Sequence, residues 1–296
     1  MRAIYDANPP PPEWSTLSPA EIRALPIFLP AAPEAVSGVV QRSIPGPGGW
    51  IALRIYRPEG PGPHPAMLYM HGGGMVFGGL DMTDRFCRAI TNSGRCIVMS
   101  VDYRLAPETK FPGALEDVYA ALRWVKASAA ALTVDPRRIG VGGFSAGGNL
   151  AAAVALLSRD RAGPAVAFQL LVMPMLDPGC DSSSMREFAE GPFATQADTR
   201  WFWGHYLRRP EDATDPYVAP LAADDLRGLP PAFIVTAGCD PFCAEGEAYA
   251  ERLRAAGVEA VARRYEGMPH NFLGFPSLDD AKQAMADIGD AIRAHL

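Results

Sequence analysis

Apolar residues along the chain recur with two periods, one typical of strands and one typical of helices. Within residues 50–56, Ile51, Leu53 and Ile55 face one way and the intervening residues face the other, which predicts a half-buried strand. Near-continuous apolar runs of strand length follow and favour strands buried on both faces of a parallel sheet: residues 66–70, 96–101, 139–142, 168–173 and 232–237. A further strand is expected at about 259–265.

Helical patterns separate these strands. Apolar residues recur at spacings of three and four over residues 115–125 and 278–292, which predicts two amphipathic helices. Residues 146–157 are apolar all round, so we expect a helix enclosed by other elements. Strands that alternate with helices predict right-handed crossovers and a three-layer α/β fold, with helices on both faces of a mostly parallel sheet.

Two segments depart from this alternation. The first 40 residues are rich in proline, which excludes a long helix or a central strand, but Ser18-Pro19-Ala20-Glu21 has the form of a capping box and predicts a helix over 19–25. Apolar residues in this segment predict that it packs on the body as a cap rather than forming a free tail: Trp14, Leu17, Ile22, Leu25, Ile27, Phe28 and Leu29. Residues 177–226 contain turn formers and an aromatic cluster, which predicts a lid-like cap insertion. We therefore expect a cap segment at 1–40 and a body at 41–296.

Composition and charge exclude several classes of protein. The chain has 296 residues, 48% apolar and 20% charged, which is typical of a globular protein. Its formal net charge of −6 and the lack of a basic run argue against nucleic-acid binding. No apolar stretch reaches the roughly 18–20 residues of a membrane span, and the N-terminus lacks the apolar core of a secretion signal, so we expect a cytoplasmic protein. The five cysteines are spread out and complete no ligand set, so we expect neither a disulfide framework nor a metal site.

The motif Gly143-Phe144-Ser145-Ala146-Gly147 lies between a predicted strand and a predicted helix. This is the setting of a nucleophile elbow, in which a serine hydroxyl projects into the cleft beyond the strand ends. The alternatives are an ordinary glycine-rich turn and a dinucleotide-binding loop that begins at Gly140. The second alternative lacks its third glycine, because Ser145 occupies that position.

A second motif, His71-Gly72-Gly73-Gly74, directly follows the strand at 66–70. Consecutive glycines let main-chain N–H groups approach a ligand and stabilise the oxyanion of an acyl transfer. The expected oxyanion hole combines the N–H groups of Gly72, Gly73 and Ala146. We interpret His71 as a structural residue of this loop and not as a base.

A serine nucleophile requires a base and an orienting carboxylate. Of the five histidines, His270 lies in a turn between the strand at 259–265 and the last helix, whereas the others lie in loops, in the aromatic insertion or at the terminus. Asp240 follows the strand at 232–237 and is the expected carboxylate, although Asp-Pro is also a good helix N-cap. The order Ser145, Asp240, His270 is that of α/β-hydrolases.

The sequence resembles the hormone-sensitive-lipase-like branch of α/β-hydrolase esterases, bacterial family IV, over roughly residues 40–295. Several multi-residue motifs carry the resemblance in the expected order: His71-Gly72-Gly73-Gly74, Tyr103-Arg104-Leu105-Ala106-Pro107-Glu108, residues 111–117, Ser145-Ala146-Gly147-Gly148-Asn149-Leu150, Asp215-Pro216-Tyr217, Asp240-Pro241 and residues 246–250. The resemblance implies an eight-stranded, mostly parallel sheet. It also implies a cap built from the N-terminal segment and the insertion, and hydrolysis of carboxylic esters without a cofactor.

Two positions depart from the family pattern. The family usually has Asp at the position of Phe144, and an aromatic residue there removes a carboxylate next to the nucleophile. It usually has Gly after the catalytic histidine, where this chain has Asn271. Neither departure removes a catalytic atom.

These observations predict a serine carboxylesterase that acts on short-chain esters through an acyl-enzyme intermediate. The expected substrate-binding residues are Met75, Val76, Phe77, Phe144, Trp201, Tyr206 and Leu273. An amidase or peptidase that uses the same triad remains an alternative, and so does a non-catalytic receptor for a small molecule, which the presence of His270 disfavours. The strand at 259–265 is a candidate exposed edge for a homodimer.

Overall fold

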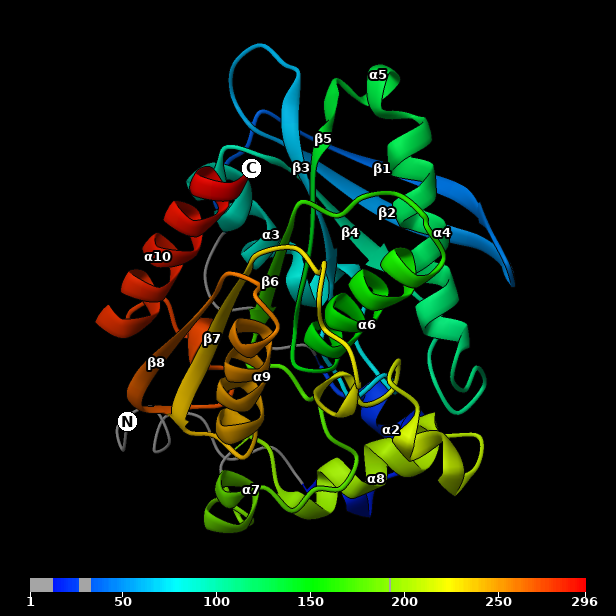
Figure 1. The fold of residues 1–296 in the computed structure, drawn as a ribbon, viewed down its shortest axis with the longest axis vertical. Coiled ribbons are helices and arrows are strands. Elements are labelled where there is room, and N and C mark those ends of the chain that lie inside the picture. Colours follow the sequence, from blue (N-terminus) through cyan, green and yellow to red (C-terminus); the bar gives the residue numbers. More distant parts are fainter. Residues whose placement is uncertain (1–12, 27–32, 192) are drawn as a thin grey trace.

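The computed structural model describes residues 13–26, 33–191 and 193–296. Eight strands form one sheet in the order β1-β2-β4-β3-β5-β6-β7-β8 (Figure 1). The strands are β1 (Gly38–Gly46), β2 (Gly49–Arg57), β3 (His64–Met70), β4 (Ile97–Asp102), β5 (Val134–Phe144), β6 (Phe168–Val172), β7 (Ala232–Cys239) and β8 (Ala260–Pro269). β2 is antiparallel to both β1 and β4, whereas the neighbours from β4 to β8 pair in parallel. The predicted mostly parallel sheet is confirmed, and β1 is a strand that the apolar pattern did not predict.

Helices cover both faces of the sheet, as predicted (Figure 1). The side chains of α3 (Leu80–Gly94) and α10 (Asp279–His295) pack in one hydrophobic cluster, and those of α4 (Gly113–Ala127), α6 (Ala146–Asp160) and α9 (Cys243–Ala255) pack in another. The remaining helical elements are η1 (Trp14–Thr16), α2 (Pro19–Ala24), α5 (Ala129–Leu132), α7 (Ser183–Glu187), α8 (Gln196–Tyr206), η2 (Pro210–Thr214), η3 (Pro220–Ala222) and η4 (Phe272–Gly274).

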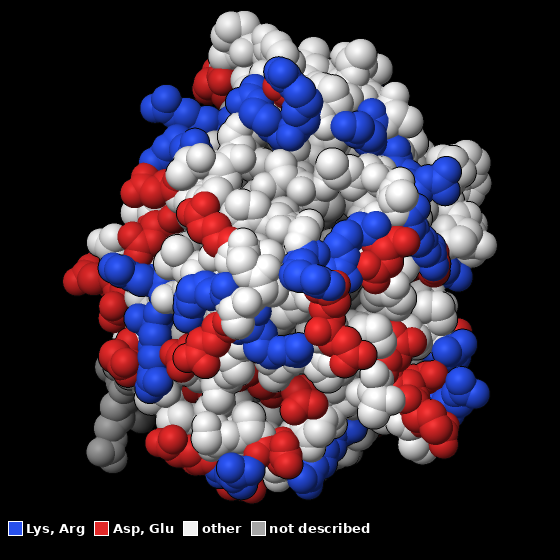
Figure 2. Space-filling view, in the orientation of Figure 1, with Lys and Arg blue, Asp and Glu red and all other residues white. Residues whose placement is uncertain are grey.

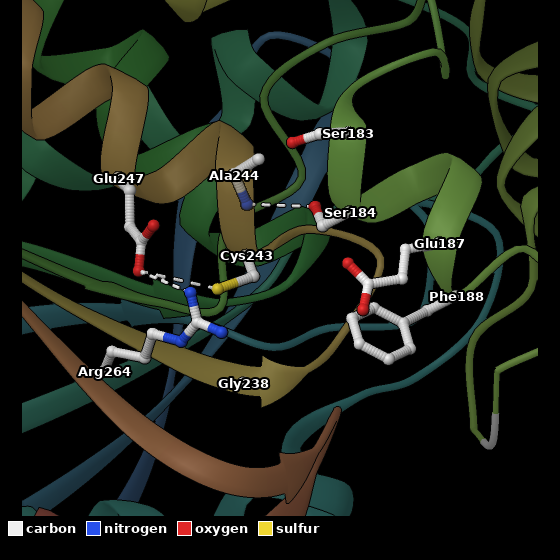
Figure 3. Close-up of a pocket in the computed structure, with 9 residues that line it drawn as sticks. All are labelled: Ser183, Ser184, Glu187, Phe188, Gly238, Cys243, Ala244, Glu247 and Arg264. Carbon is white, nitrogen blue, oxygen red and sulfur yellow. Dashed lines mark hydrogen bonds and ion pairs between the residues drawn. The ribbon is translucent and has the colours of Figure 1, made fainter.

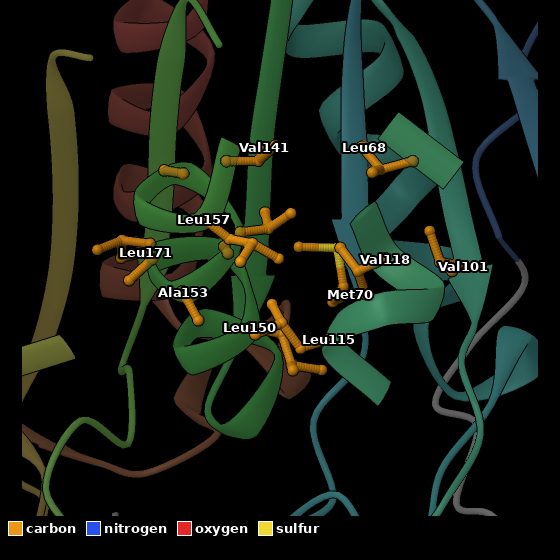
Figure 4. Packing of buried hydrophobic residues seen from close by; sticks show 14 of the residues in the cluster. Leu68, Met70, Val101, Leu115, Val118, Val141, Leu150, Ala153, Leu157 and Leu171 are labelled. Carbon is orange, nitrogen blue, oxygen red and sulfur yellow. The ribbon is translucent and has the colours of Figure 1, made fainter. Parts of the chain in front are cut away.

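Helix α6 is the central element of the larger cluster. Its residues from Ala146 to Ser158 are all buried, which confirms the prediction of a helix enclosed by other elements. Leu150 of this helix lies beside Leu115 of α4, and both belong with Leu157, Met70 of β3 and Val118 of α4 to one hydrophobic cluster (Figure 4). This packing fixes the start of α6, and therefore Ser145, relative to the ends of β3 and β5.

The elements between β6 and β7 lie with η1 and α2 beyond the carboxyl ends of the parallel strands, at the lower end of Figure 1. The predicted capping box is present, because the Ser18 hydroxyl accepts from the Glu21 N–H at 3.3 Å and the Glu21 carboxylate accepts from the Ser18 N–H at 2.8 Å. The Ser15 N–H donates to Asp198 of α8 at 2.8 Å, so the N-terminal segment contacts the insertion. Residues 1–12 and 27–32, including Ile27, Phe28 and Leu29, lie outside the described residues.

Lysine, arginine and acidic side chains alternate over the face seen in Figure 2. Within the described parts of the chain, no helix is both long and apolar enough to cross a membrane. No cluster of three or more His, Cys, Asp or Glu side chains suited to a metal ion occurs among those same residues. The five cysteines are free thiols: Cys87, Cys96, Cys180, Cys239 and Cys243.

Candidate active site

Ser145 lies at a sharp turn between β5 and α6, with φ 55° and ψ −117°. The glycines of the motif are required by close backbone contacts. An added Cβ at Gly143 would lie 2.2 Å from the Gly147 carbonyl oxygen, and one at Gly147 would lie 2.1 Å from the Met70 carbonyl oxygen. The turn is held by the Ser145 N–H, which donates to the Val172 carbonyl at 2.9 Å. The strand-turn-helix setting expected of a nucleophile elbow is therefore present.

The glycine-rich loop after β3 packs directly on this elbow. Gly73 and Gly74 have φ +105° and +60°, and the Phe77 N–H donates to the Gly73 carbonyl at 3.0 Å to close a turn. An added Cβ at Gly72 would lie 2.6 Å from the ring of Phe144 and 3.1 Å from its carbonyl oxygen. Gly72 thus packs against Phe144, the residue before Ser145. Ala146 is the first residue of α6, so its N–H has no partner within the helix.

His71 holds this loop from inside the protein. Its side chain is fully buried, its Nδ1 lies 2.7 Å from the Gly72 carbonyl oxygen, and its ring stacks on Tyr103 at 4.2 Å. The Tyr103 hydroxyl donates to the His71 carbonyl at 2.8 Å. Burial lowers the pKa of His71 to about 4, so the ring is neutral at pH 7 and donates through Nδ1 to Gly72. These contacts are those of a structural residue.

His270 and Asp240 are joined by a hydrogen bond. The Nδ1 of His270, just after β8, lies 2.9 Å from Oδ2 of Asp240, just after β7. The other carboxylate oxygen of Asp240 accepts from the Phe242 N–H at 3.0 Å, so Asp240 also holds the turn that leads into α9. The Asp240 side chain is fully buried and His270 is 5% exposed. The pair is therefore shielded from water.

The imidazole of His270 lies beside the elbow. Its ring centroid is 4.8 Å from that of Phe144, the residue before Ser145, and 5.1 Å from that of Phe242. Because β5, β7 and β8 are parallel strands of one sheet, their carboxyl ends lie along one edge, and Ser145, Asp240 and His270 each follow one of these strands there.

A family model described as the alpha/beta hydrolase fold matches residues 67–274. The chain belongs to the α/β-hydrolase family. It is 43% identical to the carboxylic ester hydrolase LipN of Mycobacterium tuberculosis over 94% of this chain and 76% of that protein. It is 34% identical to an ethyl acetate hydrolase of Pseudomonas putida over 84% of this chain and 80% of that protein.

A solved structure of EstE1, a thermostable carboxylesterase cloned from a metagenomic library, matches with a TM-score of 0.89 and 42% identity. The match covers 95% of this chain and 98% of that one. The expected relation to the hormone-sensitive-lipase-like branch is confirmed, and this hydrolase is a carboxylic ester hydrolase.

The expected substrate-binding residues of this hydrolase fall into two groups. Met75, Val76 and Tyr206 are fully buried within the larger hydrophobic cluster. Four others are half-buried: Phe77, Phe144, Trp201 and Leu273. Phe77 joins rings from two other segments, since its centroid lies 5.1 Å from Trp14 of η1 and 5.9 Å from Phe202 of α8. Parts of both predicted cap segments therefore meet at Phe77, next to the glycine-rich loop.

A polar recess of about 90 Å³ is lined by residues of α7, β7, α9 and β8 (Figure 3). No residue of the expected triad lines it. At its wall, the Ser184 hydroxyl donates to the Pro241 carbonyl at 2.7 Å and accepts from the Ala244 N–H at 3.0 Å. These bonds attach α7 to the turn next to Asp240.

Two further residues, Arg23 and Glu245, make contacts that the sequence did not predict. Arg23 of α2 donates to the Val76 carbonyl at 2.8 Å and to the Ala106 carbonyl at 2.7 Å, and it pairs with Glu108 at 2.7 Å. Helix α2 is thereby bonded to the end of the glycine-rich loop. Nothing in the local pattern around Arg23 indicates these partners, which lie more than fifty residues away along the chain.

Glu245 is a buried acid on α9. One of its oxygens accepts from the N–H groups of Leu176 and Asp177 at 2.7 and 3.0 Å, and burial raises its pKa well above the usual range. The signal for its burial is its spacing, because Glu245 falls on the same helix face as Tyr249 and Leu253, which are fully buried.

Proposed function

We propose that this hydrolase cleaves carboxylic esters by a two-step acyl transfer in which Ser145 is the nucleophile, His270 the general base and Asp240 the orienting carboxylate. The Ser145 hydroxyl attacks the ester carbonyl and passes its proton to Nε2 of His270. The imidazolium then returns this proton to the departing alcohol, which leaves an acyl-enzyme. A water molecule, deprotonated by His270, cleaves this ester and releases the carboxylic acid.

The bond between Asp240 and His270, on an imidazole packed beside the elbow of Ser145, is the observation that carries this proposal. It fixes the Nδ1–H tautomer and leaves Nε2 as the free base. The N–H groups of Gly72, Gly73 and Ala146 are proposed to stabilise the oxyanion. Each such donor contributes about 3–4 kcal/mol to the transition state in related chemistry.

We further propose that the substrates are esters with short acyl chains. The similarity to an ethyl acetate hydrolase supports this class. The rings of Trp14 and Phe202 both contact Phe77 next to the glycine-rich loop, and we propose that they bound the acyl site.

The experiment is a series of p-nitrophenyl esters from acetate to laurate, assayed with the wild type, Ser145→Ala and His270→Ala. Both variants are expected to lower kcat by about 10⁴- to 10⁶-fold, with a rate maximum at acetate or butyrate for the wild type. His64→Ala is the matched control, because His64 starts β3 at the opposite end of the sheet. Near-native turnover by Ser145→Ala would contradict the nucleophile assignment, and a maximum at laurate would contradict the substrate class. Equal turnover of a matched anilide would favour the amidase alternative.

We also propose that two copies associate through β8, which ends the sheet and exposes 48% of Val261. Light scattering of the wild type is expected to give the mass of a dimer, and Val261→Lys that of a monomer. A wild-type protein that stays monomeric at high concentration would contradict this proposal.

A further inference from the structure

Phe144 is packed between two parts of the proposed catalytic machinery. It is the last residue of β5, and its ring lies 4.8 Å from the His270 ring at an interplanar angle of 30°. The same ring occupies the space beside Gly72, where an added Cβ would lie 2.6 Å from its Cδ1 atom. One aromatic side chain thus separates the imidazole from the oxyanion loop.

The imidazole is enclosed by aromatic rings and one carboxylate. Phe144 packs on it at a shallow angle, and Phe242 meets it edge-on at 68° with a centroid distance of 5.1 Å. Asp240 is the one charged group among the described residues with a hydrogen bond to the ring. Three other titratable groups lie on the neighbouring elements. Cys243 and Glu245 of α9 interact electrostatically with Asp240, and Glu266 of β8 lies beside Gly238.

We propose that Phe144 is a positioning residue for His270, which holds the imidazole in the orientation set by Asp240 and keeps Asp240 as the only carboxylate that acts on it. This inference rests on the proposed function of His270 as the base. Offset aromatic rings prefer a defined separation and tilt, so the Phe144 ring limits rotation of the imidazole away from its bond to Asp240. The contact with Gly72 transmits the same constraint to the oxyanion loop.

The apolar character of Phe144 matters as much as its shape. A carboxylate within about 4–6 Å of an imidazole favours the charged form and raises its pKa. A general base must be unprotonated to accept the serine proton, so a second carboxylate at position 144 would move the active pH range upward.

Kinetics of four variants across pH 5–9 test this inference, with p-nitrophenyl butyrate as the substrate. Phe144→Ala is expected to lower kcat by about tenfold or more with KM changed less than about threefold, because the base is misplaced rather than the substrate. Phe144→Leu is expected to lower kcat less, and Phe144→Tyr, which keeps the ring, is expected to restore it. Phe144→Asp is expected to shift the acidic limb of the kcat/KM profile upward by about one pH unit or more.

Phe86→Leu is the matched control, since Phe86 is a half-buried aromatic residue of α3 that contacts Tyr69 at 5.4 Å. It is expected to keep wild-type kinetics. Circular dichroism identifies variants that do not fold, and the Leu and Tyr variants serve as the test if Phe144→Ala is one of them.

The inference is overturned if the folded variants change KM alone, since Phe144 would then line the substrate pocket as the sequence analysis expected. It is also overturned if the profile of Phe144→Asp coincides with that of the wild type. Ser145→Ala, assayed in parallel, separates the two proposals. If Ser145→Ala is inactive while the Phe144 variants behave like the wild type, only the role of Phe144 fails. If Ser145→Ala remains active, the proposed function itself fails.

Discussion

The buried, neutral His71 makes the stability of this hydrolase depend on pH in a way that can be calculated. The side chain is fully buried, and burial lowers its pKa from 6.5 to about 4. Above pH 6.5 the ring is neutral in the folded and in the unfolded chain, so the group has no effect on the pH dependence. Below pH 6.5 the unfolded chain binds a proton that the folded protein does not bind, and the free energy of unfolding falls with pH.

The difference between 6.5 and about 4 corresponds to about 3 kcal/mol, because one pKa unit corresponds to 1.36 kcal/mol. This loss begins near pH 6.5 and is complete near pH 4. A loss of this size is a large part of the 5–15 kcal/mol that stabilises a typical domain, so it should be readily measured.

Urea unfolding of the wild type and of His71→Asn between pH 4 and 7.5 tests the calculation. The Asn side-chain amide can donate to the Gly72 carbonyl, as Nδ1 of His71 does at 2.7 Å, but it does not titrate. His71→Asn is expected to be less stable than the wild type at pH 7.5 and to lose less stability toward pH 4. The other groups titrate in both proteins, so the difference between the two curves isolates His71. Parallel curves over this range would refute the reasoning.

Three further substitutions test the site and the packing around it. Asp240→Asn is expected to lower kcat by about 10³- to 10⁴-fold with little change in KM, because the amide no longer fixes the tautomer of His270; steady-state kinetics within tenfold of the wild type would contradict this. Ser184→Ala removes both hydrogen bonds to the turn beside Asp240 and is expected to lower the unfolding free energy by about 1–3 kcal/mol, while the exposed Ser183→Ala leaves it unchanged. Leu150→Ala, at a fully buried position of α6, is expected to cost about 2–5 kcal/mol in urea unfolding, and a cost below 1 kcal/mol would show that the core around α6 is loosely packed.

The strands of the parallel sheet were predictable because burial on both faces makes each of them a continuous apolar run. The same reasoning fails for β1. This edge strand pairs with β2 alone, and of its nine residues Ile44 is the one that is buried, so its sequence carries almost no periodic signal. β1 is a strand because it pairs with β2 across the turn from Gly46 to Gly49. The apolar pattern carries no information about this pairing.

The positions of Ser145, Asp240 and His270 at the ends of strands were predictable for a different reason. Each of these residues follows a predicted strand, and parallel strands place their carboxyl ends along one edge of the sheet. The residues that support the proposed triad were not predictable in this way. Ser184 and Arg23 act through backbone carbonyls far along the chain, and such partners depend on how the cap elements are placed rather than on any local spacing.

The two departures from the family pattern, Asn271 and Phe144, differ in whether their effect on the structure can be explained from the sequence alone. Asn271 has φ +65°, a left-handed conformation that glycine adopts freely and that asparagine tolerates better than most residues, so the exchange preserves the backbone before η4. The conformational preferences of the two residue types alone lead to that conclusion.

Phe144 differs, because nothing in its own backbone requires an aromatic ring. Its effect depends on the two groups that lie against it, the imidazole of His270 and the backbone of Gly72, which come from segments of the chain that are almost two hundred residues apart. A change of charge at such a position therefore acts on His270 and on the glycine-rich loop together, and it can be understood only once the fold has brought both of them to the end of β5.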